Sequence, residues 1–498
     1  MNALDRIIGA VSPVWGARRA AARQMLDAYG ERAYAAAKSG RRNKGWSGRS
    51  TSANGEVGSS LRDLRNRSRE FVRDSWAGQR MLDVLTSHVV GTGIVTVANT
   101  GSDALDRQVN LVLEEWAENA DVEGFLDWAG IQALAVRSMV EGGETVVRHL
   151  DIPMADAGRT VPFRLQGLEG DLIDTTRDAT SFDRSIRLGV KLGEWGRRQG
   201  LYLFESHPGE MTLGSTSSNL VAWEKLSHVY RPLRFGQVRG VPWFAAILLN
   251  ARDVQDLIEA TLVKARTEAC FAGFIRRTSG GLSPLAKKDG DGGQKITKIE
   301  PGMIADIGDG EINFASPSSQ TAFGEVYMTA MQAMAAGAGI TYDQLTGDLR
   351  QANYSSLRAG KIEFRRLVEQ VQWTVVVPQL VAPVHRRLVD RAILAGKLKA
   401  RRAGYPLDHI MPAVEPIDPK KDMEADILAV RSGRLSPQEF IGAWGRDWRK
   451  VVADTSSFYE TLDKQRSGLG LALDIDARRP AKGSPDNGKQ TGKADDDE

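Results

Sequence analysis

Apolar residues recur every three or four positions along several stretches of the chain, which predicts amphipathic helices. The longest of these patterns covers residues 244–271, and at a rise of about 1.5 Å per residue such a helix would be roughly 40 Å long. A second pattern runs from Ala322 to Ala336 and ends at Gly337 and Gly339. The segment between the two helices has short β-like runs and a loop rich in glycine and lysine. The sequence therefore predicts a helix pair that brackets a small β-containing excursion.

The first ordered helix is expected to begin near Leu61 and to stop at the turn Gly91-Thr92-Gly93, before a short strand from Ile94 to Ala98. Five arginines of this helix fall within about 60° of one face. These are Arg62, Arg65, Arg69, Arg73 and Arg80. One interpretation of the stripe is a solvated helix face, and the alternative is contact with an acidic partner or a neighbouring subunit.

Two more helices are predicted, one capped by Ser102 and one from Phe125 to Met139 that is broken by Gly142-Gly143. Between Glu144 and Arg231, short β-like runs alternate with turns. A β-rich portion set among helices indicates the α+β class, with helices in the majority.

Residues 341–354 have the composition of a loop. A helix is expected from Ser355 to about Val377, with Pro378 and Pro383 marking breaks. The chain from Leu388 to Leu462 has a helical and charged pattern, and the polar residues that follow residue 470 predict a disordered tail.

Composition and charge limit the function. The 498 residues are 42% hydrophobic and 26% charged, as in ordinary globular proteins. The 66 Lys and Arg residues exceed the 63 Asp and Glu residues by only 3. A protein that coats DNA tightly usually carries a much larger basic excess, so this balance argues against a tight, static nucleic-acid binder and is compatible with loose or sliding contact. Residues 1–60 are expected to form a basic, flexible arm.

Motifs of enzyme chemistry are absent from the sequence. It contains no P-loop, no HExxH and no GxSxG, and its six histidines are scattered without metal-ligand spacing. Cys270 is the one cysteine, so neither an internal disulfide nor a Cys-based zinc cluster can form, which fits a reducing compartment. No apolar window is long enough for a membrane span, and the N-terminus offers no signal peptide. We therefore predict no catalytic, cofactor-binding or metal-binding residue, and no enzyme.

The stretch from Gly337 to Arg358 closely resembles the signature region of lambda-type phage portal proteins. Its most specific core comprises Leu345, Thr346, Gly347, Asp348, Asn353, Tyr354, Ser355 and Ser356. Further matching stretches follow the order of the family. They are HVVGTGI after the arginine-rich helix, EGGE at 141–144, HVYRPLRFGQVRGVPWF at 228–244, PGMIADI, EPIDPKKD at 415–422 and GRDW. The resemblance covers most of residues 61–455.

This resemblance implies the portal fold, in which wing, stem, clip and crown regions surround a central channel in a ring that is typically a dodecamer. Taken in chain order, it implies a flexible arm at 1–60, an α+β wing at 61–243, the first stem helix at 244–271, a clip at 272–320, the second stem helix at 321–340, a tunnel loop and following wing helix at 341–387, a crown-like helical region at 388–470 and a disordered tail at 471–498.

The resemblance also implies partners. These are further copies of the chain, double-stranded DNA, a terminase, a head-completion or connector protein, and the major capsid or scaffolding protein, at a capsid vertex of the virion after assembly in the host cytoplasm. By their position in the signature, Arg350, Arg358 and Lys361 are candidates for DNA contact in the channel, whereas salt bridges on a helix are an equal alternative for Arg358 and Lys361. Asn353 is also a candidate helix N-cap.

Two other functions stay open. One is another phage head or head–tail joining protein, against which the signature and the long helix pair weigh. The other is a nucleic-acid-processing enzyme, which would need a P-loop or a metal-binding acidic cluster.

Overall fold

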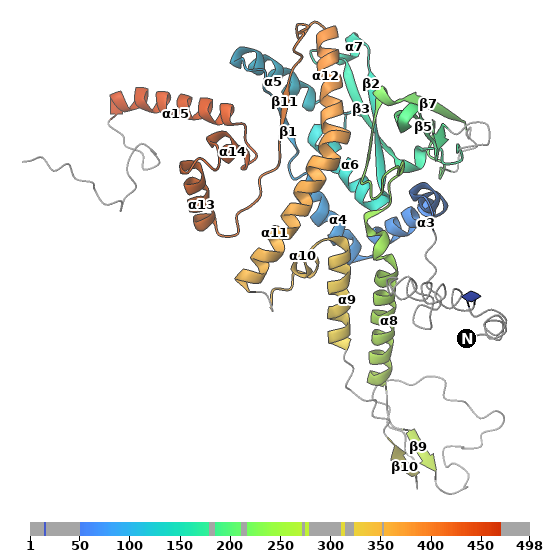
Figure 1. Cartoon of the computed structure of the whole chain (residues 1–498). Helices are drawn as coiled ribbons and strands as arrows, with labels where there is room; N and C mark the ends of the chain where they lie inside the picture. Colours follow the sequence, from blue (N-terminus) through green and yellow to red (C-terminus); the bar gives the residue numbers. More distant parts are fainter. Residues whose placement is uncertain are drawn as a thin grey trace, which may run out of the picture. The chain divides into compact units, whose positions relative to one another are not determined.

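The computed structural model (Figure 1) describes residues 14–15, 50–178, 185–210, 217–270, 274–277, 310–313, 323–350 and 353–469. Most of the predicted arm (1–60), most of the predicted clip (272–320) and all of the predicted tail (471–498) lie outside these ranges. The chain divides into two units, and the larger one begins at Ala53. No helix among the described residues is long and apolar enough to cross a lipid bilayer.

Four helices and one short strand begin the larger unit: α3 (Ala53–Asp74), α4 (Trp76–Val89), β1 (Val95–Ala98), α5 (Asp103–Ala117) and α6 (Trp128–Gly142). The predicted strand is confirmed, but the chain becomes helical at Ala53 and not near Leu61. The early start depends on contacts with a segment far away in sequence. Asn54 donates from Nδ2 to the Gly236 carbonyl and accepts at Oδ1 from the Val238 amide, which holds the first turn of α3 in place.

Two details of this region differ from the prediction. The helix expected to run unbroken to Gly91 is interrupted at Ser75, where the backbone is extended before α4 begins. Ser102 precedes α5 as expected, but its side chain makes no capping hydrogen bond. Asp106 organises this turn instead, because its Oδ1 accepts from both the amide and the hydroxyl of Thr100.

Two antiparallel sheets follow, with the strand orders β3-β2-β8 and β4-β5-β6-β7. The first contains β2 (Glu144–Asp151), β3 (Phe163–Glu169) and β8 (Leu226–Tyr230). The second contains β4 (Ile186–Arg187), β5 (Val190–Leu192), β6 (Arg198–Phe204) and β7 (Ser218–Ala222). The β-rich portion predicted between Glu144 and Arg231 is therefore confirmed, and together with the helices it confirms the α+β class.

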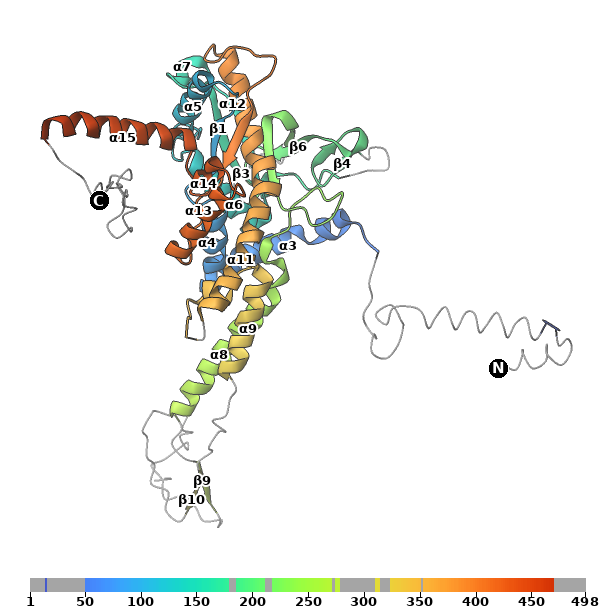
Figure 2. The same ribbon diagram turned by 60° about the vertical axis from the view of Figure 1, so that its left-hand side comes forward.

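The predicted helix pair is formed by α8 (Leu248–Cys270) and α9 (Phe323–Ala338), which lie side by side in both views (Figures 1 and 2). A short 3₁₀ turn, Trp243–Ala246, leads into α8. The indole Nε1 of Trp243 donates to the Ala338 carbonyl at 2.7 Å, so the base of one helix is tied to the end of the other. In the segment between the helices, β9 (Phe274–Arg277) pairs antiparallel with β10 (Gly310–Asn313).

The helix predicted to end near Val377 continues to Leu394 in three consecutive segments: α11 (Tyr354–Val371), the π-helical η7 (Gln372–Val381) and α12 (Ala382–Leu394). Pro378 and Pro383 lie inside this helix and do not break it, contrary to the prediction. In a π-helix each amide bonds five residues back, as the Ala382 amide does with the Val377 carbonyl. The wider turn gives the Pro378 ring the space that an α-helix denies it, and Pro383 lies in the first turn of α12, directly after the π-helical segment.

The pattern from Leu388 to Leu462 predicted a helical region, but this part of the chain also contains a strand. The strand β11 (Leu407–Ile410) pairs antiparallel with β1, so that Val95 lies opposite Ile410. The helices that follow are α13 (Pro419–Arg431), α14 (Pro437–Gly442) and α15 (Trp448–Leu469). The end of α12 also belongs to the main core, since Leu388 and Ala392 are fully buried there.

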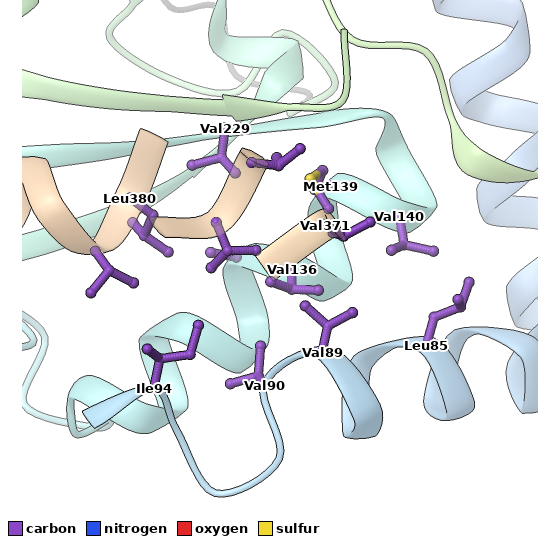
Figure 3. Close-up of a cluster of buried hydrophobic side chains, with 14 of the residues drawn as sticks. Leu85, Val89, Val90, Ile94, Val136, Met139, Val140, Val229, Val371 and Leu380 are labelled. Carbon is purple, nitrogen blue, oxygen red and sulfur yellow. The ribbon is translucent and has the colours of Figure 1, made fainter. Parts of the chain in front are cut away.

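One large apolar core joins these elements (Figure 3). Its members come from helices and strands far apart in sequence, including Val89 of α4, Val136 of α6, Val229 of β8 and Leu380 of η7. Trp116 of α5 is fully buried in the same core, where its ring stacks on Phe163 and its Nε1 donates to the Phe163 carbonyl at 2.9 Å. The core therefore positions both the β3-β2-β8 sheet and the helix from residue 354 to residue 394.

The glycine that ends α6 gives a test of this packing. Gly143 has φ +91°, and a Cβ there would lie 2.6 Å from the backbone nitrogen of Pro242. Gly143→Ala should lower the free energy of unfolding by more than about 2 kcal/mol, because backbone strain adds to a clash that no side-chain rotation relieves. Gly101→Ala is the control, since Gly101 has φ +78° and no neighbour within 4 Å, so only the strain of about 1–2 kcal/mol applies. Urea unfolding of both variants measures the difference, and equal losses would contradict the close approach.

Candidate functional site

The signature residues build the turn that connects α9 to α11. This turn contains a short helix, α10 (Tyr342–Thr346), where the sequence had suggested only a loop. Leu345 is buried in the core, and Gly347 ends α10 in the left-handed conformation with φ +71°. The Thr346 hydroxyl accepts from the Asp348 amide at 3.1 Å. Leu345-Thr346-Gly347-Asp348 thus forms one anchored helix end.

The second half of the signature begins α11. Asn353 is the N-cap, as the sequence had suggested: its Oδ1 accepts from the Ser356 amide at 2.8 Å. The Ser356 hydroxyl in turn accepts from the Asn353 amide at 3.2 Å, which completes a reciprocal capping box. Ser355 is exposed in the first turn, next to Tyr354. Several signature residues therefore define where one helix ends and the next begins.

The three candidate DNA contacts differ in their surroundings. Arg350 is 87% exposed and binds Asp348 through two nitrogens, at 2.9 and 2.8 Å, which lowers the pKa of that carboxyl to about 2. Arg358 forms a salt bridge at 3.1 Å with Asp422 of α13. Lys361 is partly buried on α11 and forms no ion pair or hydrogen bond with a residue that the structure describes. The three side chains remain candidates for DNA contact.

The Arg358–Asp422 pair connects two stretches that the sequence had singled out separately, the signature and EPIDPKKD. Asp422 also accepts from the amides of Ile417 and Asp418 and so organises the start of α13. Two turns further along α11, Arg365 donates to the Glu415 carbonyl. The exposed side of α11 is thereby fastened to the beginning of the C-terminal helices.

A second group of matching stretches meets at a buried ion cluster around Glu144. Arg65 of α3 donates to Oε1 of Glu144 at 2.6 Å, and Arg239 binds the same carboxylate through Nε and Nη2 at 2.9 and 2.5 Å. His228 Nε2 lies 3.0 Å from Oε2, which also accepts from the Gly240 amide at 2.9 Å. The side chains of Arg239, Glu144 and His228 are wholly buried, and that of Arg65 is 4% exposed. We call these four side chains the Glu144 cluster.

Charge balance explains how this cluster tolerates burial. Burial alone would raise the pKa of Glu144, but Arg239, His228 and Arg65 together hold it well below its usual value. Burial lowers the pKa of His228, which therefore stays neutral at pH 7. Asp171, 3.2 Å from Arg65, supplies a second carboxylate. Two arginines thus face two carboxylates, and the buried charges cancel.

The arginine stripe of α3 and α4 divides between the two interpretations: Arg62, Arg73 and Arg80 are exposed, whereas Arg65 and Arg69 bind carboxylates. Besides Arg65, Arg69 lies 2.7 Å from both Glu169 and Asp171, and Arg80 donates to the Gln344 carbonyl of α10 at 2.9 Å. The acidic partners of Arg65 and Arg69 therefore lie in the same chain.

Glu169, Asp171 and His207 come close enough to share a metal ion, a grouping that no sequence spacing signals. The Arg69 guanidinium, however, already binds both carboxylates and supplies the positive charge that they require. This arrangement favours a structural ion pair over a metal site.

Removing one partner of the Glu144 cluster should be costly. Arg239→Met leaves Glu144 with less compensation in a dry environment, and we expect a loss of about 3–5 kcal/mol in the free energy of unfolding. Arg137→Met is the matched control, because Arg137 pairs with Asp83 at the surface, with side chains 32% and 50% exposed, and should lose at most about 1 kcal/mol. Chemical denaturation of the two variants gives the comparison, and a small loss at Arg239 would show that the cluster contributes little.

Buried histidines predict a pH dependence. Burial lowers the pKa of His149 and of His385 to about 4 in the folded chain, from about 6.5 when unfolded. Between pH 6.5 and pH 4 the unfolded chain therefore binds more protons than the folded chain. The free energy of unfolding is highest above pH 6.5 and falls as the pH drops towards 4, by up to about 3 kcal/mol per histidine. Denaturation at pH 7, 6 and 5 measures this slope, and His385→Gln should reduce it. A slope that is flat in the parent chain would refute the assignment.

The chain is similar in sequence to proteins of one known family. The model described as phage portal protein, lambda family, matches residues 39–372. The probable portal protein of Halomonas phage phiHAP-1 is 25% identical over 443 residues, which cover 84% of each chain. Portal protein B of Escherichia phage lambda is 23% identical over 325 residues, which cover 58% of this chain and 61% of that protein. A solved chain from the neck of an empty gene transfer agent particle covers 77% of this chain and 93% of its own length, with 17% identity and a TM-score of 0.45.

The matched residues include α3, the Glu144 cluster, both helices of the α8–α9 pair and the signature turn, and they make up more than half of the chain. The chain belongs to the lambda family of phage portal proteins.

Proposed function

We propose that copies of this chain assemble head to tail into a closed ring at one vertex of a capsid, and that double-stranded DNA passes through the hole. Membership of the portal family carries the proposal, and that family is a structural one and not a class of enzymes. In the assembled ring α8 and α9 would form the stem, the segment with β9 and β10 the clip, residues 61–243 the wing, and residues 388–470 the crown. A dodecamer is the expected size.

The exposed apolar side chains of the isolated chain support assembly. From residue 411 to residue 464, Leu462 is the only buried residue, although α13 to α15 carry several large apolar side chains. Leu428 of α13 is 68% exposed and Leu262 of α8 is 51% exposed. Apolar surface of this extent usually lies in an interface, and a head-to-tail arrangement that closes on itself would cover it in every copy.

The charge of the chain supports passage of DNA better than retention. Each phosphate contact strengthens binding, and a ring repeats each cation in its hole once per subunit. One or two of Arg350, Arg358 and Lys361 would then suffice for contact. The small net charge of +3 keeps the affinity for DNA low enough for the duplex to slide.

The remaining partners follow from the same proposal. A terminase would dock at the clip during packaging and a head-completion or connector protein would replace it later, while the wing would face the major capsid or scaffolding protein. Assembly would take place in the host cytoplasm before the ring becomes part of the virion.

Electron microscopy and sedimentation of the purified full chain test the ring. We expect closed rings with a central hole, and we expect Leu262→Glu and Leu428→Glu to shift the population towards single chains, because a carboxylate would replace a buried apolar contact. Leu220→Glu is the control, since Leu220 is 47% exposed on the outermost strand β7. Single chains under every solvent condition, or metal-dependent cleavage of DNA by such a chain, would overturn the proposal.

A further inference from the structure

A pocket of about 490 Å³ lies beside β8, at one edge of the β3-β2-β8 sheet. Its walls come from β8, from η7 and α12, and from the second sheet, and they include Arg198, Trp223, Pro383, Arg386 and Arg387. The size is that of a site that accepts a small ligand or a few side chains of a partner.

The walls of this pocket are rich in arginine. Arg198 lies over the rings of Trp223 and Tyr230, with its guanidinium carbon 5.4 and 5.1 Å from their centroids. Arg387 is held by Asp151 at 3.1 Å, yet its buried Nε has no hydrogen-bond acceptor among the described residues. Arg386 is exposed at the rim and forms no ion pair in the described part of the chain. Glu224 and Asp390 also line the pocket, so its charge is mixed with arginine in excess.

An exposed acidic loop lies at the opposite edge of the same sheet. Asp121, in the connection between α5 and α6, forms a parallel bridge with Leu165 of β3, and the Val122 amide donates to the Leu165 carbonyl at 2.9 Å. Since β3 pairs with β2 on one side only, the loop and the pocket face away from each other across the sheet. They cannot meet within one chain.

This loop is fixed in a conformation that exposes an aromatic ring. The carboxylate of Asp121 accepts from the amides of Glu123, Phe125 and Leu126 at 3.2, 3.1 and 3.1 Å, which ties the loop into one turn. The Phe125 side chain is nevertheless 87% exposed, although a flexible loop could have folded it inwards. A preorganised apolar knob loses little entropy when it binds.

The two surfaces are complementary in charge. Between Arg107 and Arg137 the chain carries six Asp or Glu residues and no Lys or Arg. Residues 386–402 begin in the pocket wall, with Arg386, Arg387 and Asp390, and carry seven Lys or Arg residues and one Asp in all. Head-to-tail contacts require two different, matching surfaces on each copy, and these two provide a knob with acidic flanks and a pocket with basic flanks.

We propose that Phe125 of each copy inserts into the pocket beside β8 of the next copy, with Glu123 pairing with Arg386 across the interface. The proposal rests on the proposed ring and identifies one of its contacts. The occupant of the pocket is thus a second copy of this chain, which explains why an aromatic ring and an arginine-lined cavity are both left open in the single chain.

A charge exchange tests the pairing. Glu123→Lys and Arg386→Glu should each raise the protein concentration needed for half-maximal ring formation by about tenfold, and the double variant should recover most of the loss. Glu118→Lys is the matched control, because Glu118 is also exposed on the acidic side but outside the loop. Combined with Arg386→Glu, it should give no recovery. Thermal unfolding of dilute, unassembled protein verifies that each variant folds.

Crosslinking tests the position of the knob independently of affinity. In a Cys270→Ser background, Glu123→Cys combined with Arg386→Cys should give a ladder of linked chains with a short bis-maleimide, whereas Glu118→Cys with Arg386→Cys should not. Parent rings that form normally while the variants neither lose assembly nor crosslink would overturn this contact and leave the ring intact. A parent chain that never forms rings would overturn the ring itself. Crosslinks within one chain only would contradict the topology argued above.

Discussion

The pairing of buried charges at Glu144 is the interaction on which the rest of the structure depends. A carboxylate in the dry interior is tolerable only with cations and donors at hydrogen-bond distance, and here they come from α3, from β8 and from the loop before α8. Three regions far apart in sequence, α3, β2 and residues 228–239, are thereby fixed at one point. Because α8 begins shortly after Arg239, the cluster also sets where the helix pair leaves the sheets.

Much of the secondary structure could be predicted from the local sequence pattern, because the spacing of apolar residues indicates helices and strands and the glycines indicate where they end. The α8–α9 pair, the β-rich portion and the Asn353 cap were found in this way. The exceptions have a common cause. A helical stripe of arginines looks the same whether it faces water or carboxylates, and Glu144, the partner of Arg65, is 79 residues away. Pro378 signals a break only if the helix stays α, and a change to π winding depends on tertiary packing.

Within a single chain, several signature residues have a structural role: they fix the ends of helices. Gly347 and Asn353 end one helix and begin another, and Arg358 binds Asp422, so the turn holds α9, α11 and the C-terminal helices in a fixed relation. Such a turn could be located from the sequence, because caps follow simple rules. Contacts with DNA could not, because they exist only when several copies surround a hole and no single chain contains that surface.

The pairing of β1 with β11 has a consequence for synthesis. Residues 95–98 find their strand partner only at 407–410, and Trp116 and Trp128 contact His385, so these aromatic rings cannot be fully covered before most of the chain has left the ribosome. Contacts of such long sequence separation slow folding and leave apolar surface open in the nascent chain. The unit from residue 53 onwards must therefore fold late and as a whole, and a truncated product would expose its own core.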